Sequence, residues 1–123
     1  MTQDPSQDPS QVVPPVFVGI DVAKDKLDLA RSDSVELIAV ANDGQGIARV
    51  VRELTAARPT RIVVESTGGL ERPLLEALLD ANMPVALVNP ARVRHFAIGI
   101  GILAKTDPID ARVLVKFAQL AEP

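Results

Sequence analysis

The hydrophobic positions of this chain begin with three short runs that have the spacing of strands. Val16–Asp21 (VFVGID) is apolar until it ends in a carboxylate, and its Gly19 leaves room for a close approach by another backbone or a ligand. Leu27–Arg31 alternates apolar and polar residues, as a half-buried strand does. Val35–Val40 follows a polar turn. Three strands joined by short polar links predict an antiparallel meander.

Two helices are predicted in the middle of the chain, one on each side of an apolar strand. The first follows Asn42 and Asp43, either of which is a candidate N-cap, and it ends at Arg58-Pro59. Its apolar positions have helical spacing and are Ile47, Val50, Val51 and Leu54. The strand is Arg61–Ser66. The predicted apolar face of the second helix consists of Leu70, Leu74, Leu75, Leu78 and Leu79.

The last third of the chain predicts a short strand at Val85–Val88 and two further helices. Asn89-Pro90 opens the first of them, and Val93 and Phe96 are expected to point inward. The expected buried side of the final helix consists of Ile109, Val113, Leu114, Phe117 and Leu120. A meander followed by right-handed β-α-β crossovers predicts an α/β fold with a mixed sheet, three antiparallel strands and then parallel strands, flanked by helices. That is the ribonuclease H-like outline.

Composition narrows the functional classes. The chain has 123 residues, is 47% hydrophobic and has a formal net charge of −3, so it suits one globular domain rather than a basic nucleic-acid clamp. It has no cysteine, which excludes disulfides and thiolate metal sites. Residues 1–15 repeat QDPS with little to bury and predict a disordered leader before a domain over 16–123. No apolar stretch approaches the ~20 residues of a membrane span, and there is no signal peptide, so we expect a cytoplasmic protein.

Four carboxylates form the candidate site. Asp21 and Glu65 each end an apolar strand, and adjacent parallel strands would bring both side chains to one edge of the sheet. Asp107 and Asp110 are three residues apart at the start of a predicted helix and would share a face. Four converging carboxylates cannot all stay ionised without a counter-charge. Magnesium suits such an all-oxygen site, and two ions about 4 Å apart could activate a nucleophile and stabilise the leaving oxygen of a phosphodiester.

Each acid also has a structural explanation. Asp107 before Pro108 fits an N-cap with proline at the first helical position, and Asp110 then fits a capping-box acid. Glu65 fits an ordinary strand end. The prediction therefore depends on the conjunction of the four acids.

Other polar residues are candidates for nucleic-acid contact, and each of them also fits a turn or a solvated face. The loop after Glu65 offers backbone N–H groups to a phosphate, a basic run surrounds His95, and a lysine lies beside Asp107. These candidates are Thr67, Gly68, Arg92, Arg94 and Lys105. His95 is the only histidine, so a zinc site is not expected. Asp28 lies in an alternating strand and is expected to face solvent.

Four motifs cover nearly all of the chain after the leader. They are VGIDVAKDKLDLA (residues 18–30), VVESTGGLERPL (63–74), VNPARVRHFA (88–97) and LAKTDPIDARVLVKFA (103–118). In this order and at this spacing they resemble the N-terminal domain of DEDD-type transposases of the Piv invertase group, found in bacterial insertion sequences. The resemblance implies a RuvC-like, ribonuclease H-type fold with magnesium or manganese as cofactor. It places the family's tetrad on Asp21, Glu65, Asp107 and Asp110.

The resemblance also implies an activity and partners. These are DNA cleavage and strand transfer during insertion-sequence transposition in the bacterial cytoplasm, guided by a structured RNA, in a homo-oligomer. Such transposases carry a C-terminal domain with a serine thought to attack DNA, and a coiled coil between the two domains. Both lie outside this sequence, so we expect the fragment to bind metal but not to recombine DNA alone.

Three other functional classes remain open at this point. A Holliday-junction resolvase shares the fold. Actin-like ATPases and sugar kinases also begin with a strand that ends in Asp, but they usually place Gly and Thr after it, whereas Val22-Ala23-Lys24 follows here. A non-catalytic RNA-binding or dimerisation module would use the acids only as caps.

Overall fold

The computed structural model describes residues 13–121. The predicted leader therefore lies outside the described residues, except for residues 13–15, which form neither helix nor strand. The elements, in chain order, are β1 (Phe17–Val22), β2 (Lys26–Arg31), β3 (Leu37–Ala41), α1 (Gly44–Ala57), β4 (Arg61–Glu65), α2 (Arg72–Asp80), β5 (Val85–Val88), α3 (Pro90–Gly99) and α4 (Ala111–Leu120).

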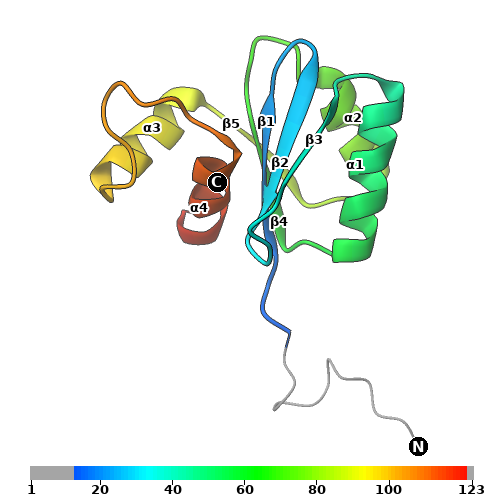
Figure 1. Ribbon diagram of the computed structural model, residues 1–123, viewed down its shortest axis with the longest axis horizontal. Coiled ribbons are helices and arrows are strands. Elements are labelled where there is room, and N and C mark those ends of the chain that lie inside the picture. The colour runs from blue at the N-terminus through cyan, green and yellow to red at the C-terminus, as the bar shows by residue number, and fades with distance from the viewer. Residues whose placement is uncertain (1–12, 122–123) are drawn as a thin grey trace, which may run out of the picture.

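The strands form one five-stranded mixed sheet in the order β3-β2-β1-β4-β5, with β1 at its centre (Figure 1). β1 and β2 are antiparallel, as are β2 and β3, whereas β1, β4 and β5 run parallel. The predicted meander and the parallel strands after it are therefore confirmed. The third strand begins at Leu37 rather than Val35, which lies in an exposed turn.

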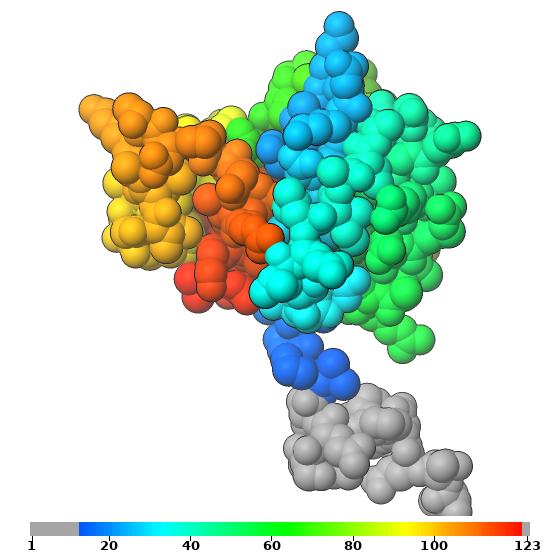
Figure 2. Space-filling view, viewed as in Figure 1, coloured from blue at the N-terminus to red at the C-terminus, as the bar shows by residue number. Residues whose placement is uncertain are grey.

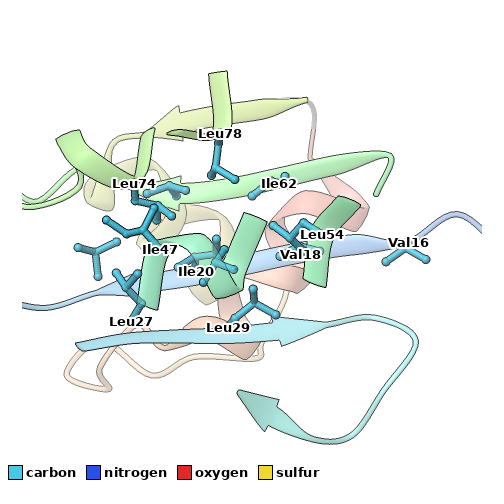
Figure 3. Packing of buried hydrophobic residues seen from close by; sticks show 13 residues of the cluster. Val16, Val18, Ile20, Leu27, Leu29, Ile47, Leu54, Ile62, Leu74 and Leu78 are labelled. Atoms are coloured by element: carbon cyan, nitrogen blue, oxygen red, sulfur yellow. The ribbon is translucent and has the colours of Figure 1, made fainter. Parts of the chain in front are cut away.

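The side chains of β1 alternate between the two faces of the sheet. Val18, Ile20 and Val22 pack in a cluster with residues of α1 and α2, and Figure 3 shows Val18 beside Leu54 of α1. Gly19 and Asp21 lie on the opposite face, which α3 and α4 cover (Figure 1). Each face of the sheet thus has its own helical layer, and the candidate acids belong to the α3–α4 side.

α1 and α2 differ in how closely they match the prediction. Asp43, not Asn42, caps α1, and its carboxylate accepts a hydrogen bond from Gly46 N at 2.8 Å. α2 begins at Arg72, next to Pro73, so Leu70 precedes the helix and is exposed. Leu79 is also exposed, at 54%, because this helix buries only the seam formed by Leu74 and Leu78. The predicted five-leucine face is therefore wrong at two positions.

α4 crosses β1 closely because Gly19 has no side chain. A Cβ at Gly19 would overlap the carbonyl oxygen of Ala111 and lie 2.6 Å from Cβ of Leu114. The buried residues of α4 are Ala111, Leu114, Val115, Phe117 and Ala118. Leu120 is 63% exposed, so its predicted burial is wrong. Across residues 13–121, none of the helices combines the length and apolar character needed to span a bilayer.

Candidate active site

Two carboxylates lie side by side at the carboxyl ends of β1 and β4. The parallel register pairs Ile20 with Val64, so the residues that follow, Asp21 and Glu65, are neighbours across the two strands. Because paired residues of adjacent strands point to the same face, both side chains are on the α3–α4 side. Both residues are half-buried. The fold therefore places two acids from distant parts of the sequence at one edge of the sheet.

A third acid, Asp28, joins this face. Asp28 is the direct partner of Asp21 in the antiparallel β1–β2 pair, and its side chain is only 16% exposed. The expectation that it faces solvent is wrong. The tight turn between the strands, closed by a hydrogen bond from Ala23 N to the carbonyl of Lys26, sets the register that makes Asp21 and Asp28 opposite each other. Lys26 offers a partial counter-charge, with Nζ 3.4 Å from Asp28.

Asp110 approaches the same site from the start of α4. Its carboxylate caps the helix by accepting from Val113 N at 3.0 Å, and its charge acts on Asp21. Asp107 does not share a helical face with it, because α4 begins only at Ala111. The carboxylate of Asp107 instead accepts from Ala104 N at 2.8 Å. The N-cap role considered for Asp107 is therefore wrong, and Asp110 caps α4 in its place.

The electrostatics of the site penalise its negative charge. The pKa of Asp21 is raised, first by burial and then by repulsion from Asp28 and Asp110, while Lys26 opposes the shift. The pKa of Glu65 is raised by burial and by Asp21, and Arg94 opposes that shift. A proton or an added cation would relieve this cost.

Arg94 connects α3 to the loop that carries Asp107. Its guanidinium donates hydrogen bonds to the carbonyls of Lys105 at 3.2 Å and of Asp107 at 2.8 Å, and its charge acts on Glu65. Arg92 stacks over the ring of Phe117, with 5.5 Å between the guanidinium carbon and the ring centroid, and Lys105 is exposed. Nucleic-acid contact by these three residues stays a prediction.

The loop after Glu65 already holds an anion of the chain itself. Thr67 N, Thr67 Oγ1 and Gly69 N donate to Oε2 of Glu71 at 3.2, 2.5 and 3.1 Å. Glu71 is only 6% exposed, and its pKa is lowered chiefly by the hydrogen bond from Thr67. Glu71 therefore occupies the N–H groups of Thr67 and Gly69 in this structure. Nucleic-acid contact by Thr67 and Gly68 stays a prediction. The sequence analysis did not predict this role of Glu71. A carboxylate just after a Gly-Gly turn could have indicated it, because the backbone N–H groups of such a turn bind anions.

The donor chemistry of this edge suits a hard cation. The acids supply only oxygen ligands, which Mg²⁺ and Mn²⁺ prefer. Within residues 13–121, no three carboxylate or imidazole side chains are grouped closely enough to hold one ion as they stand. Asp21 and Glu65 are the two acids that the register already holds together, and a third ligand for one ion would require a side chain or loop to move.

Comparison with known proteins shows the family to which the chain belongs. A family model for transposases of the DEDD, IS110 type matches residues 18–122. The chain belongs to the DEDD transposase family. The transposase domain is 25% identical over 113 residues to the pilin gene-inverting proteins of Moraxella lacunata and Moraxella bovis. The alignment covers 87% of this chain and 35% of each relative, so the chain spans about a third of their length.

Solved structures confirm the predicted fold of the transposase domain. A Thermus thermophilus RuvC in complex with a Holliday junction superposes with a TM-score of 0.58 at 22% identity, over 83% of this chain and 90% of that one. Another Thermus thermophilus RuvC structure has a TM-score of 0.52 at 25% identity, over 73% and 71%. The domain thus has the RuvC-like, ribonuclease H-like fold.

Proposed function

We propose that this transposase domain supplies the metal-dependent centre that cleaves DNA phosphodiester bonds and takes part in strand transfer during insertion-sequence transposition. The observation that carries the proposal is the adjacency of Asp21 and Glu65 on parallel strands, at a site where burial and neighbouring acids raise the pKa of both. Such a site binds a divalent cation favourably, because the cation removes the cost of packing carboxylates together.

Asp21, Glu65 and Asp110 would hold magnesium or manganese. When bound, two such ions would activate the attacking oxygen and stabilise the leaving oxygen of a phosphodiester. Asp107 would complete the tetrad after its carboxylate releases Ala104 N. The negative charge of Asp28 repels that of Asp21, and the positive charge of Arg94 offsets part of the negative charge at Glu65. The chain itself therefore orients the acids and sets the charge that an ion has to balance.

The relatives support DNA as the substrate. The Moraxella proteins are named for inverting pilin genes, and the Thermus RuvC is bound to a Holliday junction. We further propose a structured guide RNA, a C-terminal transposase domain and a second copy of the chain as partners, in the bacterial cytoplasm. We expect the fragment alone to be inactive in recombination.

The test is calorimetric titration of Mn²⁺ into the wild-type chain and into Asp21→Asn and Glu65→Gln. Both substitutions should weaken binding at least tenfold, because each removes a ligand charge. Asp80→Asn, on an exposed acid at the end of α2, is the matched control and should bind as the wild type does. Equal Mn²⁺ affinity in Asp21→Asn and the wild type would refute the assignment.

A junction resolvase is the second candidate, favoured by the likeness to the RuvC that holds a Holliday junction. Mg²⁺-dependent cleavage of a four-way junction by this chain alone would favour it over the transposase. A non-catalytic RNA-binding or dimerisation module instead predicts RNA affinity that is unchanged when the acids are neutralised, together with no Mn²⁺ binding.

A further inference from the structure

The exposed side of α4 carries two cations next to the acid site. Arg112 and Lys116 are one helical turn apart, and Arg112 is two residues beyond Asp110. They line a pocket of about 240 Å³ between α4 and the β2–β3 turn. The other polar residues that line it are Arg31, Ser32, Ser34 and Gln119. Figure 2 shows the red end of the chain against the cyan surface of that turn.

A second hollow, of about 260 Å³, shares the two cations and reaches one of the acids. It is lined by Ile102, Asp110 and Val113 together with the same two cations, Arg112 and Lys116. The two hollows, which we call the α4 groove, therefore share a basic pair in the middle and reach Asp110 at one end. The groove is open at the surface, as a site for a passing strand requires.

The cations of the α4 groove differ in whether they already have a hydrogen-bond partner within the chain. Arg31 is held by Asp33 through hydrogen bonds of 2.8 and 2.7 Å, and Arg112 donates to the carbonyl of Val35. Lys116 is exposed and makes no ion pair or hydrogen bond with the residues that the structure describes. Its ammonium is thus available to an outside anion.

Serine hydroxyls add donors on the opposite wall. Ser32 Oγ accepts from Phe17 N at 2.9 Å and Ser34 Oγ accepts from Glu36 N at 3.1 Å, which leaves each hydroxyl proton free to be donated. Ammonium, guanidinium and hydroxyl groups are the side-chain donors that contact phosphates in protein–DNA complexes.

We propose that the α4 groove binds the backbone of the DNA strand that enters the acid site, with a phosphate between Lys116 and Arg112. This inference rests on the proposed function and extends it to a strand path. Lys116 is six positions beyond Asp110, which is about 9 Å along the helix axis at 1.5 Å per residue. Since each strand of a DNA duplex carries one phosphate per about 3.4 Å of duplex axis, a duplex aligned with α4 would place the bound phosphate about two to three nucleotides from the phosphate nearest Asp110.

The test measures DNA affinity by fluorescence anisotropy of a labelled four-way junction and a linear duplex, in Ca²⁺ and at several salt concentrations. Lys116→Gln should weaken both about equally, by severalfold, and lower the salt slope by about 1. Lys116→Glu should weaken them further. Arg49→Gln removes an exposed cation from α1, on the other face of the sheet, and should change nothing.

Separate readouts keep this inference apart from the proposed function. Lys116→Gln should keep the wild-type Mn²⁺ affinity, whereas Asp21→Asn should lose Mn²⁺ without losing the salt-dependent contact at Lys116. If Lys116→Glu leaves the DNA affinity and its salt dependence unchanged, the proposal that DNA binds in the α4 groove is wrong. If the Lys116 variants lose affinity only for an RNA duplex of the same sequence and keep their affinity for DNA, then DNA is not the ligand of the α4 groove.

Discussion

Replacing Gly19 by alanine tests the contact that positions α4 over the acid site. The new Cβ would overlap the carbonyl oxygen of Ala111 and lie 2.6 Å from Leu114 Cβ and 2.7 Å from Val115 N. Two of these three atoms belong to the backbone, so no side-chain rotation can relieve the overlap. α4 would have to shift away from β1, and Asp110 would move with it.

Overpacking in a core costs typically 1–3 kcal/mol, and backbone neighbours place Gly19→Ala at the upper end, at about 3 kcal/mol. With urea m-values of about 1–3 kcal/mol/M, the unfolding midpoint should fall by about 1–3 M. Mn²⁺ affinity should fall as well, because Asp110 is displaced from Asp21.

Urea unfolding followed by circular dichroism measures the effect, and Gly44→Ala is the matched control. A Cβ at Gly44, the first residue of α1, meets nothing within 4 Å, so this variant should be as stable as the wild type or slightly more stable. If Gly19→Ala unfolds within about 0.5 kcal/mol of the wild type, the close crossing of α4 over β1 is wrong.

Three further predictions concern single side chains, and urea unfolding checks each of them. Glu71→Gln should cost about 1.5–3 kcal/mol at neutral pH, since it replaces a buried charged acceptor; the lowered pKa of Glu71 means that the difference from the wild type is lost as pH falls through the folded-state pKa. Asp21→Asn should stabilise the metal-free chain at neutral pH, because burial raises the pKa of Asp21; this advantage should shrink as pH falls through that raised pKa and vanish below the ordinary value of 3.8. Phe117→Ala should cost about 3–5 kcal/mol, whereas Leu120→Ala should stay within about 0.5 kcal/mol because it is exposed.

Local patterns in the sequence are enough to predict most of the fold. The apolar runs of β1 and β4 indicate strands that are buried on both faces, and the alternation of Leu27–Arg31 indicates a strand that is buried on one face. Asp43 before Gly44 signals the start of α1. Leu79 and Leu120 are exposed although the helical spacing of apolar residues predicts that they are buried. A helix of nine or ten residues covers a narrow stripe of its neighbours, and the sequence does not reveal how wide that stripe is.

The site is less accessible to sequence reasoning, because it depends on register and on hydrogen bonds between side chain and backbone. The strand-end positions of Asp21 and Glu65 follow from the apolar runs before them. The approach of Asp28 depends on the turn that closes the β1–β2 hairpin, and the burial of Glu71 depends on three donors in one loop. The sequence favours Asp107 as the N-cap because Pro108 follows it, whereas α4 begins at Ala111 and is capped by Asp110.

Paramagnetic broadening of amide NMR signals by Mn²⁺ tests the metal centre most directly, since it reports where in the fold the ion resides. An ion held by Asp21, Glu65 and Asp110 selectively broadens the amides around these residues at substoichiometric Mn²⁺, and Asp21→Asn abolishes the effect. Uniform broadening, or broadening centred on acids elsewhere in the chain, would contradict it.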